Sequence, residues 1–216
     1  LSKSMDGTVL FKNLSIIVNK GDKIAFISKN SLALTSFFEI LNGRVKPDTG
    51  EFIYGTTINT AYIPNDNSEY FAEKSPLIDW LRQYAQTDEE REEVYLRTFL
   101  GRMLFTGEEA LKTANVLSGG EKVRCMLSKM MLAKANLLMM DEPTNHLDLE
   151  SITALNNGMQ EFQGTILFTS HDHELVNTVA NRIVEITPNG IIDKMMPYDD
   201  YLADARITQM QEELYV

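Results

Sequence analysis

The chain has 216 residues, enough for one large domain with a sizeable core or for a domain with a subdomain. No apolar run approaches the ~20 residues of a membrane span, so no direct membrane insertion is expected. The formal net charge of −11 argues against this domain alone wrapping a nucleic-acid backbone, because phosphate contacts need clustered Lys and Arg. The single Cys125 excludes an internal disulfide framework, and its apolar helical neighbours predict a core position.

Short strands are predicted in the first third of the chain, around one strand–loop–helix joint. The expected strands are residues 9–11, 14–18, 23–27, 51–54 and 59–63. Residues 19–22 and 47–50 have the composition of turns. Apolar spacing predicts a helix over 31–41, with Leu34, Phe37, Phe38 and Leu41 on one face.

Helices and strands alternate in the rest of the chain. Residues 76–132 are expected to be mostly helical, and the run from Thr87 to Glu90 fits a capping box. Strands are then predicted at 137–140, 165–169, 183–186 and 191–194, with helices near 149–161 and 173–180. This alternation is typical of a parallel α/β sheet, and residues 198–216 indicate a polar helix or tail.

Two adjacent carboxylates follow the apolar residues 137–140 in the stretch NLLMMDEPTNHLD. After Asp141 and Glu142, Pro143 prevents the strand from continuing. A core strand with two acids at its carboxyl end is the arrangement expected of a phosphate and magnesium site in an open α/β sheet. Taken alone, the pair favours a simpler interpretation, which is a strand that ends in a polar turn.

The second informative stretch is LSGGE, from Leu117 to Glu121. Ser118 can cap a helix that begins here, and Glu121 can reach back to complete a capping box. The two intervening glycines leave backbone N–H groups of the first turn bare, and the helix dipole favours an anion such as phosphate there. A capping box alone is common, so this stretch gains meaning only beside the others.

LSGGE, then DEP, then His171 in a strand-ending FTSHD together resemble the ATP-binding cassette (ABC) family over essentially the whole chain. MDEPTNHLDL is similar in particular to the F subfamily, in which two cassettes share one polypeptide without a membrane domain. The resemblance implies an α/β fold: a P-loop NTPase-like cassette with a mixed sheet core, an antiparallel β subdomain and a helical subdomain. It also implies a cytoplasmic location.

The resemblance implies one nucleotide-binding domain over residues 1–216. Its parts are the core sheet and β subdomain (1–65 and 133–197), the helical subdomain ending in the signature helix (66–132) and a C-terminal tail (198–216). LSGGEKVRC and the closing NRIVEITPNGI are similar to the second, C-terminal cassette of such proteins. Because the chain opens on Leu1 and falls directly into a strand pattern, we expect a fragment of a two-cassette chain.

The family pattern assigns roles to individual residues, with ATP and Mg²⁺ as cofactors. Asp141 matches the carboxylate that holds Mg²⁺ through water, and Glu142 matches the general base that polarises the attacking water. His171 matches the switch histidine that contacts the γ-phosphate, whereas a structural role is the simpler interpretation for His173. The D-loop that crosses to the partner cassette matches Asn145, His146, Leu147 and Asp148. The signature that closes over ATP held by the opposing cassette matches Leu117, Ser118, Gly119, Gly120 and Glu121.

The phosphate loop departs from the family pattern G-x-x-x-x-G-K-[ST]. The matching residues are Ser28, Lys29, Asn30, Ser31, Leu32, Ala33, Leu34 and Thr35, followed by Ser36. Both glycines and the phosphate lysine are replaced, and only Thr35, the magnesium-ligand position, survives. Leu34 cannot donate to a phosphate, and Lys29 at the second position is expected to face solvent. Either natural divergence or mutagenesis would account for these changes, and the sequence does not distinguish between the two.

Replacements at two further nucleotide-binding positions are also expected to lower the affinity for nucleotide. The aromatic residue that stacks on adenine is replaced by Met5, and the Q-loop glutamine by Asn65. Loss of a charge-assisted phosphate bond and of an aromatic stack costs roughly 2.5–6 kcal/mol if additive, enough to turn a micromolar site millimolar. The cassette's own nucleotide site is therefore predicted to be weak, while its signature remains fit to complete the partner's site.

Three functions follow from the resemblance. The first is the ATPase cassette of an F-type protein that acts on the ribosome through parts outside this chain. The second is the ATPase subunit of a membrane transporter, against which Asn65 and the NHLD sequence argue. The third is a regulatory half that binds an active cassette without turning over ATP.

Overall fold

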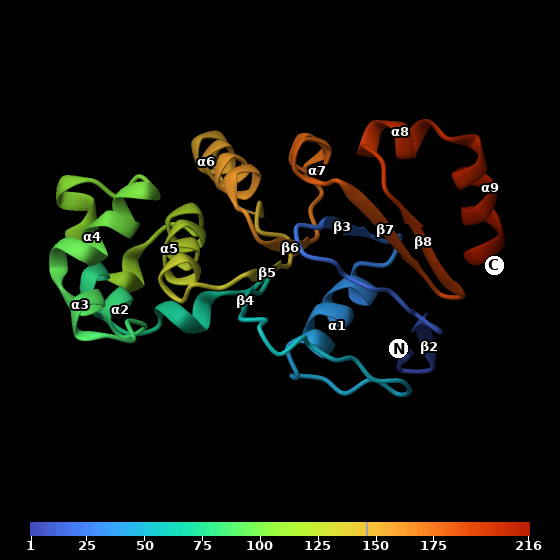
Figure 1. Cartoon of the computed structure of the whole chain (residues 1–216), viewed down its shortest axis with the longest axis horizontal. Helices are drawn as coiled ribbons and strands as arrows, with labels where there is room; N and C mark the ends of the chain where they lie inside the picture. The colour runs from blue at the N-terminus through green and yellow to red at the C-terminus, as the bar shows by residue number, and fades with distance from the viewer. Residues whose placement is uncertain (146) are drawn as a thin grey trace.

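The computed structural model describes residues 1–145 and 147–216. Its centre is a six-stranded sheet with the order β4-β5-β6-β3-β7-β8 (Figure 1). In that order the strands are β4 (Thr60–Ile63), β5 (Leu137–Met140), β6 (Thr165–Phe168), β3 (Lys23–Ile27), β7 (Arg182–Thr187) and β8 (Gly190–Lys194). Neighbouring strands run parallel, except that β8 pairs antiparallel with β7. The predicted mixed sheet is therefore confirmed.

The helices that flank this sheet include α1 (Ser31–Leu41), α6 (Leu149–Glu161) and α7 (His173–Val179). Strand side chains alternate between two apolar clusters, as the two-residue period of a strand requires. In β3, Ile24 packs in the cluster with Phe37 of α1, whereas Ala25 packs in the cluster with Leu155 of α6 and Leu175 of α7. Figure 1 accordingly shows α1 on one side of the sheet and α6 and α7 on the other.

The middle of the chain forms a helical part at one end of the molecule (Figure 1), as predicted for residues 76–132. Its helices are α2 (Leu77–Arg82), α3 (Asp88–Arg91), α4 (Glu93–Arg102) and α5 (Gly119–Leu132), with 3₁₀ turns η1 (Ser68–Phe71), η2 (Gly107–Leu111) and η3 (Ala114–Val116). Cys125 is fully buried in α5, as expected. Thr87 caps α3, but the carboxylate of Glu90 accepts from the N–H of Gln86 and from Lys134, so the capping box predicted there is only half formed.

Residues 198–216, expected to be a polar helix or tail, form α8 (Tyr198–Ala203) and α9 (Ala205–Leu214). Both are anchored by buried side chains. Tyr201 is 1% exposed and its hydroxyl donates to Glu185 of β7 at 2.6 Å, while Ile207 is buried in the larger apolar cluster. The C-terminal segment is thus part of the packed structure.

A two-stranded antiparallel sheet, β1 (Lys3–Met5) with β2 (Thr8–Phe11), lies beside α1. The predicted strands at 14–18 and 51–54 are wrong, because neither segment has a ladder partner among the described residues. Within the described residues, only the N-terminal side of each segment has backbone hydrogen bonds to the start of the chain. Leu1 exchanges two hydrogen bonds with Leu14, and the N–H of Ser2 donates to the carbonyl of Thr49, just before residues 51–54. The side chains of Ile17 and Ile53 remain 78% and 86% exposed.

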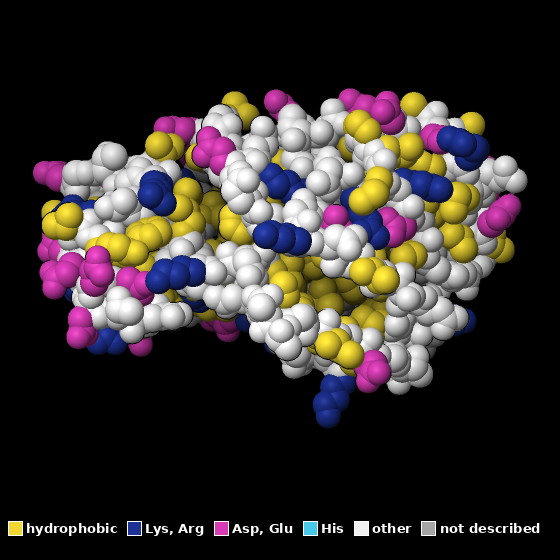
Figure 2. All heavy atoms as spheres, in the orientation of Figure 1, with side chains coloured by type: hydrophobic (Ala, Val, Ile, Leu, Met, Phe, Trp, Pro, Cys, Tyr) yellow, Lys and Arg dark blue, Asp and Glu magenta, His cyan; other side chains and the backbone are white. Residues whose placement is uncertain are grey.

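These two segments border an open apolar hollow of about 1950 Å³, which is visible in Figure 2. Phe37 and Leu41 of α1 and Leu137 of β5 contribute to its wall. Along the part of the chain that the structure describes, no helix combines the length and the apolar character that a membrane crossing needs.

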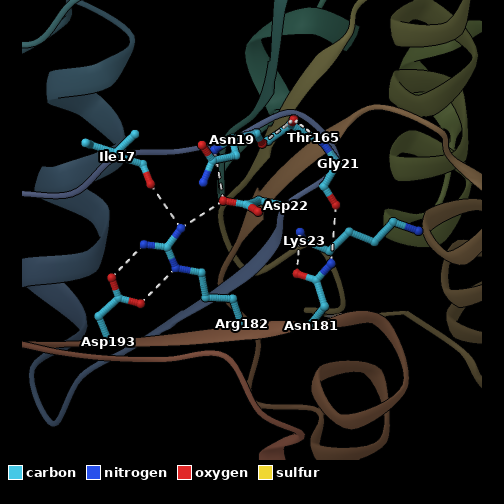
Figure 3. A network of polar contacts seen from close by, with 9 residues as sticks. All are labelled: Ile17, Asn19, Gly21, Asp22, Lys23, Thr165, Asn181, Arg182 and Asp193. Carbon is cyan, nitrogen blue, oxygen red and sulfur yellow. Dashed lines mark hydrogen bonds and ion pairs between the residues drawn. The ribbon is translucent and has the colours of Figure 1, made fainter.

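A buried arginine fixes the chain where it enters β3 (Figure 3). Arg182, at the start of β7, donates through Nη1 to Asp22 at 2.8 Å and to the carbonyl of Ile17 at 3.0 Å. Its Nε and Nη2 donate to the two carboxylate oxygens of Asp193 on β8, at 2.8 and 2.6 Å. The β7–β8 hairpin therefore holds the turn before β3, and β3 in turn positions the loop at its other end.

Candidate functional site

Chemically active side chains follow three neighbouring strands, β5, β6 and β3, at their carboxyl ends. Asp141 and Glu142 follow β5, Thr169 and His171 follow β6, and Ser28 follows β3. Because parallel strands end on the same edge of the sheet, residues far apart in sequence converge there.

The two predicted magnesium positions lie in direct contact. The hydroxyl of Thr35, on α1, donates to Oδ2 of Asp141 at 3.0 Å. The hydroxyl of Thr169 donates to Oδ1 of the same carboxylate at 3.0 Å. Asp141 is 1% exposed, and this burial raises the pKa of its carboxyl group. Both carboxylate oxygens are therefore oriented by hydroxyl donors in a buried setting.

The backbone leaves the extended conformation of β5 at Glu142. Its φ of 50° lies in the left-handed region, which costs a non-glycine residue on the order of 1–3 kcal/mol and is typical of functional sites. Its N–H donates to the hydroxyl of Thr169 at 2.9 Å, which holds this conformation. The strand ends at Met140 and the chain turns at Glu142, one residue before Pro143, to which the sequence analysis assigned the break.

The carboxylate of Glu142 is paired with His171. Oε2 accepts from the backbone N–H of His171 at 3.2 Å, and Oε1 lies 3.4 Å from Nε2 of the imidazole. Burial raises the pKa of Glu142, and the neighbouring His171 lowers it in part. His171 has a side chain that is 78% exposed, whereas that of Glu142 is 10% exposed. The predicted general base and switch histidine are therefore neighbours.

A cavity of about 280 Å³ adjoins this pair. Glu142, His171 and Ser28 line it together with Leu34, which occupies the position of the phosphate lysine. Tyr198 of α8 and His173 of α7 form another part of the wall, and Nε2 of His173 pairs with Asp199 at 2.9 Å. The volume is small for a ligand of nucleotide size, and the wall at Leu34 is apolar.

The expected phosphate loop is mostly helix. Because α1 begins at Ser31, only Ser28, Lys29 and Asn30 separate it from β3. Ala33 and Leu34 favour helix strongly where glycine and lysine would stand in the family pattern. Neither Ser28 nor Ala33 has a positive φ, so the chain accommodates both without strain. Residues 31–36 therefore lie within α1 and do not wrap around a ligand.

Three backbone N–H groups in the loop and the first turn of α1 already have acceptors. That of Asn30 donates to Oγ of Ser28 at 3.2 Å, and that of Leu32 donates to Oδ1 of Asn30 at 3.1 Å. That of Lys29 donates to the hydroxyl of Tyr215 at 3.0 Å. A bound phosphate would have to displace these partners, which reduces the net gain from each new hydrogen bond.

Of the predicted nucleotide-binding residues, only Ser28 and Leu34 line the cavity. Met5 is 38% exposed at the β1–β2 turn, and Ser36 is buried in α1. Asn65 accepts a hydrogen bond from Nδ2 of Asn145 at 3.3 Å, so the Q-loop position contacts the D-loop rather than the other site residues. His146, another predicted D-loop residue, lies outside the described residues.

The LSGGE stretch forms the start of α5, away from α1 (Figure 1). Its predicted capping box is confirmed: the N–H of Glu121 donates to Ser118 at 3.3 Å, and that of Ser118 donates to Glu121 at 2.8 Å. Ser118 and Gly119 are exposed, whereas Leu117 and Gly120 are buried.

Gly120 makes a close approach to α6. A Cβ atom at this position would lie 2.8 Å from Oγ of Ser151 and 3.7 Å from Leu147. Asp148 caps the same helix by accepting from the N–H of Ser151 at 2.8 Å. The second signature glycine thus has a packing role that the sequence analysis missed.

Tyr215 contacts the loop at residues 28–30, and the sequence analysis did not predict this contact. Besides accepting from the N–H of Lys29, its ring lies under the Lys29 amine, with Nζ 4.1 Å from the centroid. The available signal was Glu185, a charged residue inside the apolar run of β7. Glu185 is 3% exposed and therefore required polar partners from elsewhere in the chain.

Comparison with known proteins agrees with this geometry. A family model described as "ABC transporter" matches residues 11–145. The uncharacterized ABC transporter ATP-binding protein YkpA of Bacillus subtilis is 59% identical over 216 residues, which are 100% of this chain and 40% of the relative. ABC transporter F family member 5 of Arabidopsis thaliana is 30% identical over 209 residues, 95% of this chain and 30% of the relative. The chain therefore spans two fifths or less of these relatives.

A solved dimeric cassette of a bacterial ABC transporter shares the fold. Its TM-score is 0.72 at 15% identity, over 90% of this chain and 94% of that one. The similarity extends from the mixed sheet to the helical part, and the family model independently covers more than half of the sequence. The chain belongs to the ABC transporter family.

Proposed function

We propose that this chain is an ATP-binding and ATP-hydrolysing cassette of an F-type ABC protein, built to act with a second cassette. The observation that supports this most is the meeting of Thr35 with Asp141, and of Glu142 with His171, at one edge of the sheet. A Mg²⁺-assisted hydrolysis of a phosphoanhydride needs a hard oxygen site beside a positioned base. This edge provides both.

Thr35 and Asp141 are the residues that would hold Mg²⁺. Their hydroxyl and carboxylate oxygens match the ligands this ion prefers, and it commonly completes its shell with water and phosphate oxygens. When bound with ATP, the ion supplies neutralisation of the phosphate charge. Thr169 fixes the orientation of Asp141 by donating to its other carboxylate oxygen.

Glu142 would accept the proton of the attacking water. A raised pKa brings its carboxylate closer to the working pH, where a general base is most effective. The strained φ and the bond from its N–H to Thr169 hold the side chain at the edge of the sheet. His171, exposed and 3.4 Å from Glu142, is free to turn toward a terminal phosphate.

The nucleotide site on this cassette's own loop is proposed to be weak. Leu34 offers no charge, the loop is reduced to three residues, and the N–H groups of Lys29 and Asn30 are already bonded. Met5 gives no aromatic surface for adenine. The hydrolytic residues are therefore in place without a strong phosphate cradle beside them.

The signature is proposed to serve the partner. Ser118 and Gly119 are exposed at the N-terminus of a capped helix of 14 residues, where the dipole favours an anion. A second cassette, in the same chain or in a dimer, would supply that anion as its ATP. The dimeric state of the similar solved cassette supports this arrangement.

The likeness to an F-family relative supports the F-type assignment. With that assignment we propose a role on the ribosome, exerted in the cytoplasm through parts of the protein outside this chain. The division into a core sheet with β subdomain, a helical subdomain at 66–132 and a C-terminal segment belongs to the same proposal. The second candidate is the ATPase subunit of a membrane transporter, which the family description and the solved transporter cassette favour. The third is a regulatory cassette, favoured by the poor phosphate loop.

Two measurements on the full-length protein separate these functions. With ATP present, the F-type function predicts co-sedimentation with ribosomes, whereas co-purification with membranes instead would favour the transporter. Glu142→Gln is expected to lower steady-state ATPase activity of the full-length protein. An unchanged rate in that variant, beside a lost rate for the equivalent change in the other cassette, would identify a regulatory half.

A further inference from the structure

The phosphate loop is held by the C-terminal segment. Tyr215, directly after α9, accepts the N–H of Lys29 through its hydroxyl at 3.0 Å and covers the Lys29 amine with its ring at 4.1 Å. One residue thus fixes both the backbone and the side chain of the second loop position. A cation–π contact at an exposed site is weak, so it biases the side chain without locking it.

Tyr215 is itself held in place by a hydrogen bond to a buried carboxylate. The hydroxyl of Tyr215 donates to Glu185 at 2.9 Å, and Glu185 also accepts from Tyr201 and Gln211, each at 2.6 Å. In the β3–β7 pairing Glu185 lies opposite Ile27, the last residue before the loop. Helices α8 and α9 are therefore linked by hydrogen bonds to the point where the loop begins.

Lys29 is the cation that this arrangement controls. It is the only Lys or Arg in the sequence between Lys23 and Arg44, so it is the one positive charge on the segment that has Leu34 in place of the phosphate lysine. Its neighbour Ser28 lines the cavity beside Glu142, but Lys29 is not among the lining residues. The amine is turned toward Tyr215 and away from the cavity.

We propose that Tyr215 is a positioning residue that keeps the Lys29 amine out of the nucleotide site, so that the C-terminal segment sets the nucleotide affinity of this cassette. Release of Tyr215 frees the Lys29 N–H and lets the amine swing toward the phosphates that Leu34 cannot bind. The inference rests on the proposed nucleotide site and adds a control of its affinity.

The test is titration of the 216-residue chain with a fluorescent ATP analogue and Mg²⁺, comparing wild type with Tyr215→Ala. A new charge-assisted contact to phosphate is expected to tighten binding about tenfold or more. Lys29→Ala is the reference background, in which adding Tyr215→Ala is expected to give no gain. Equal or weaker binding by Tyr215→Ala, or a gain that persists without Lys29, would overturn the proposal.

A measurement on the unaltered protein covers the case in which Tyr215→Ala does not fold. In the free protein the NMR signals of the Lys29 side chain should be shifted by the ring current of Tyr215. Addition of the ATP analogue with Mg²⁺ to saturation is expected to move them toward ordinary lysine values. Signals that keep their ring-current shift in the bound state would contradict displacement of Lys29 from the ring.

The outcomes for the proposed function and for this control are separable. Weakness of the site is judged from the wild-type affinity alone, whereas the control by Tyr215 is judged from the ratio between variant and wild type. Tyr215→Phe provides an intermediate case: it keeps the ring under the amine and removes only the hydroxyl. It should give a smaller gain than Tyr215→Ala.

Discussion

The hydroxyl of Thr35 donates to Oδ2 of Asp141 across 106 residues of sequence, at 3.0 Å. The contact joins α1, which follows β3, to the end of β5, two strands away in the sheet. The two proposed magnesium positions therefore meet, whereas the proposed phosphate loop beside them is mostly helix.

Thr35→Ala is expected to weaken binding of the ATP analogue in Mg²⁺ while leaving binding in EDTA unchanged. The variant also removes a donor from buried Asp141, so the free energy of unfolding should fall by about 1 kcal/mol. Thr35→Ser keeps the hydroxyl and serves as the control. Equal loss of affinity with and without Mg²⁺ would show that Thr35 acts on the protein scaffold only.

Gly120→Ala is expected to destabilise the chain by about 1–3 kcal/mol, because the added Cβ would lie 2.8 Å from Ser151 Oγ. Gly158→Ala, in α6, is the matched control: its Cβ meets nothing within 4 Å, and alanine should stabilise that helix by up to about 1 kcal/mol. Urea denaturation measures both. Similar effects of the two substitutions would contradict the close approach of α5 and α6.

Glu121, in the signature stretch, is expected to make a pH-dependent contribution to the free energy of unfolding. Burial alone would raise the pKa of Glu121, but hydrogen bonds from Lys112 and Ser118 outweigh it and lower the pKa below 4.5. The folded state therefore binds this proton less readily than the unfolded state. The contribution is present above about pH 4.5 and is lost as the pH falls through the lowered pKa.

Glu121→Gln should accordingly cost about 0.5 kcal/mol of unfolding free energy at pH 7, and this cost should shrink as the pH falls below about 4.5. Urea denaturation at a series of pH values checks this. A difference between wild type and variant that grows as the pH falls would have the wrong sign for the contacts of Glu121 with Lys112 and Ser118.

Arg182→Ala is expected to lower the free energy of unfolding by about 3–5 kcal/mol, because it leaves the buried carboxylate of Asp22 without its partner. Arg182→Lys should recover only part of the loss, since a lysine cannot bind Asp22 and Asp193 in the same fork geometry. Arg206→Ala, at an exposed pair with Asp204, should leave the midpoint unchanged. A small effect of Arg182→Ala would contradict its role in fixing the entry to β3.

The sequence predicted well where a local pattern and a buried environment agree. The apolar run before Asp141 forms β5 as expected, and Ser118 with Glu121 forms the capping box that their spacing indicates. The helix over 31–41 is also confirmed. This helix takes up most of the expected phosphate loop, because the helix-favouring Ala33 and Leu34 replace the glycine and the lysine of the family pattern.

The sequence failed where long-range partners decide the outcome. Ile17 and Ile53 lie in segments with strand-like patterns, yet a strand requires a neighbour, and neither segment has one among the described residues. Tyr215 lies 186 residues from Lys29, and no pattern near either residue indicates the contact. Gly120 is similar, because its need for space comes from Ser151 on another helix.

The central claim, a sound hydrolytic edge beside a weak phosphate loop, is tested most directly by restoring the loop. The affinity for a fluorescent ATP analogue with Mg²⁺ is measured for wild type and for Ser28→Gly/Ala33→Gly/Leu34→Lys, with Leu34→Met as a control that adds no charge. The restored loop should bind at least about tenfold more tightly than wild type, and Leu34→Met should match wild type. Low-micromolar binding by wild type, with no gain on restoration, would contradict the account.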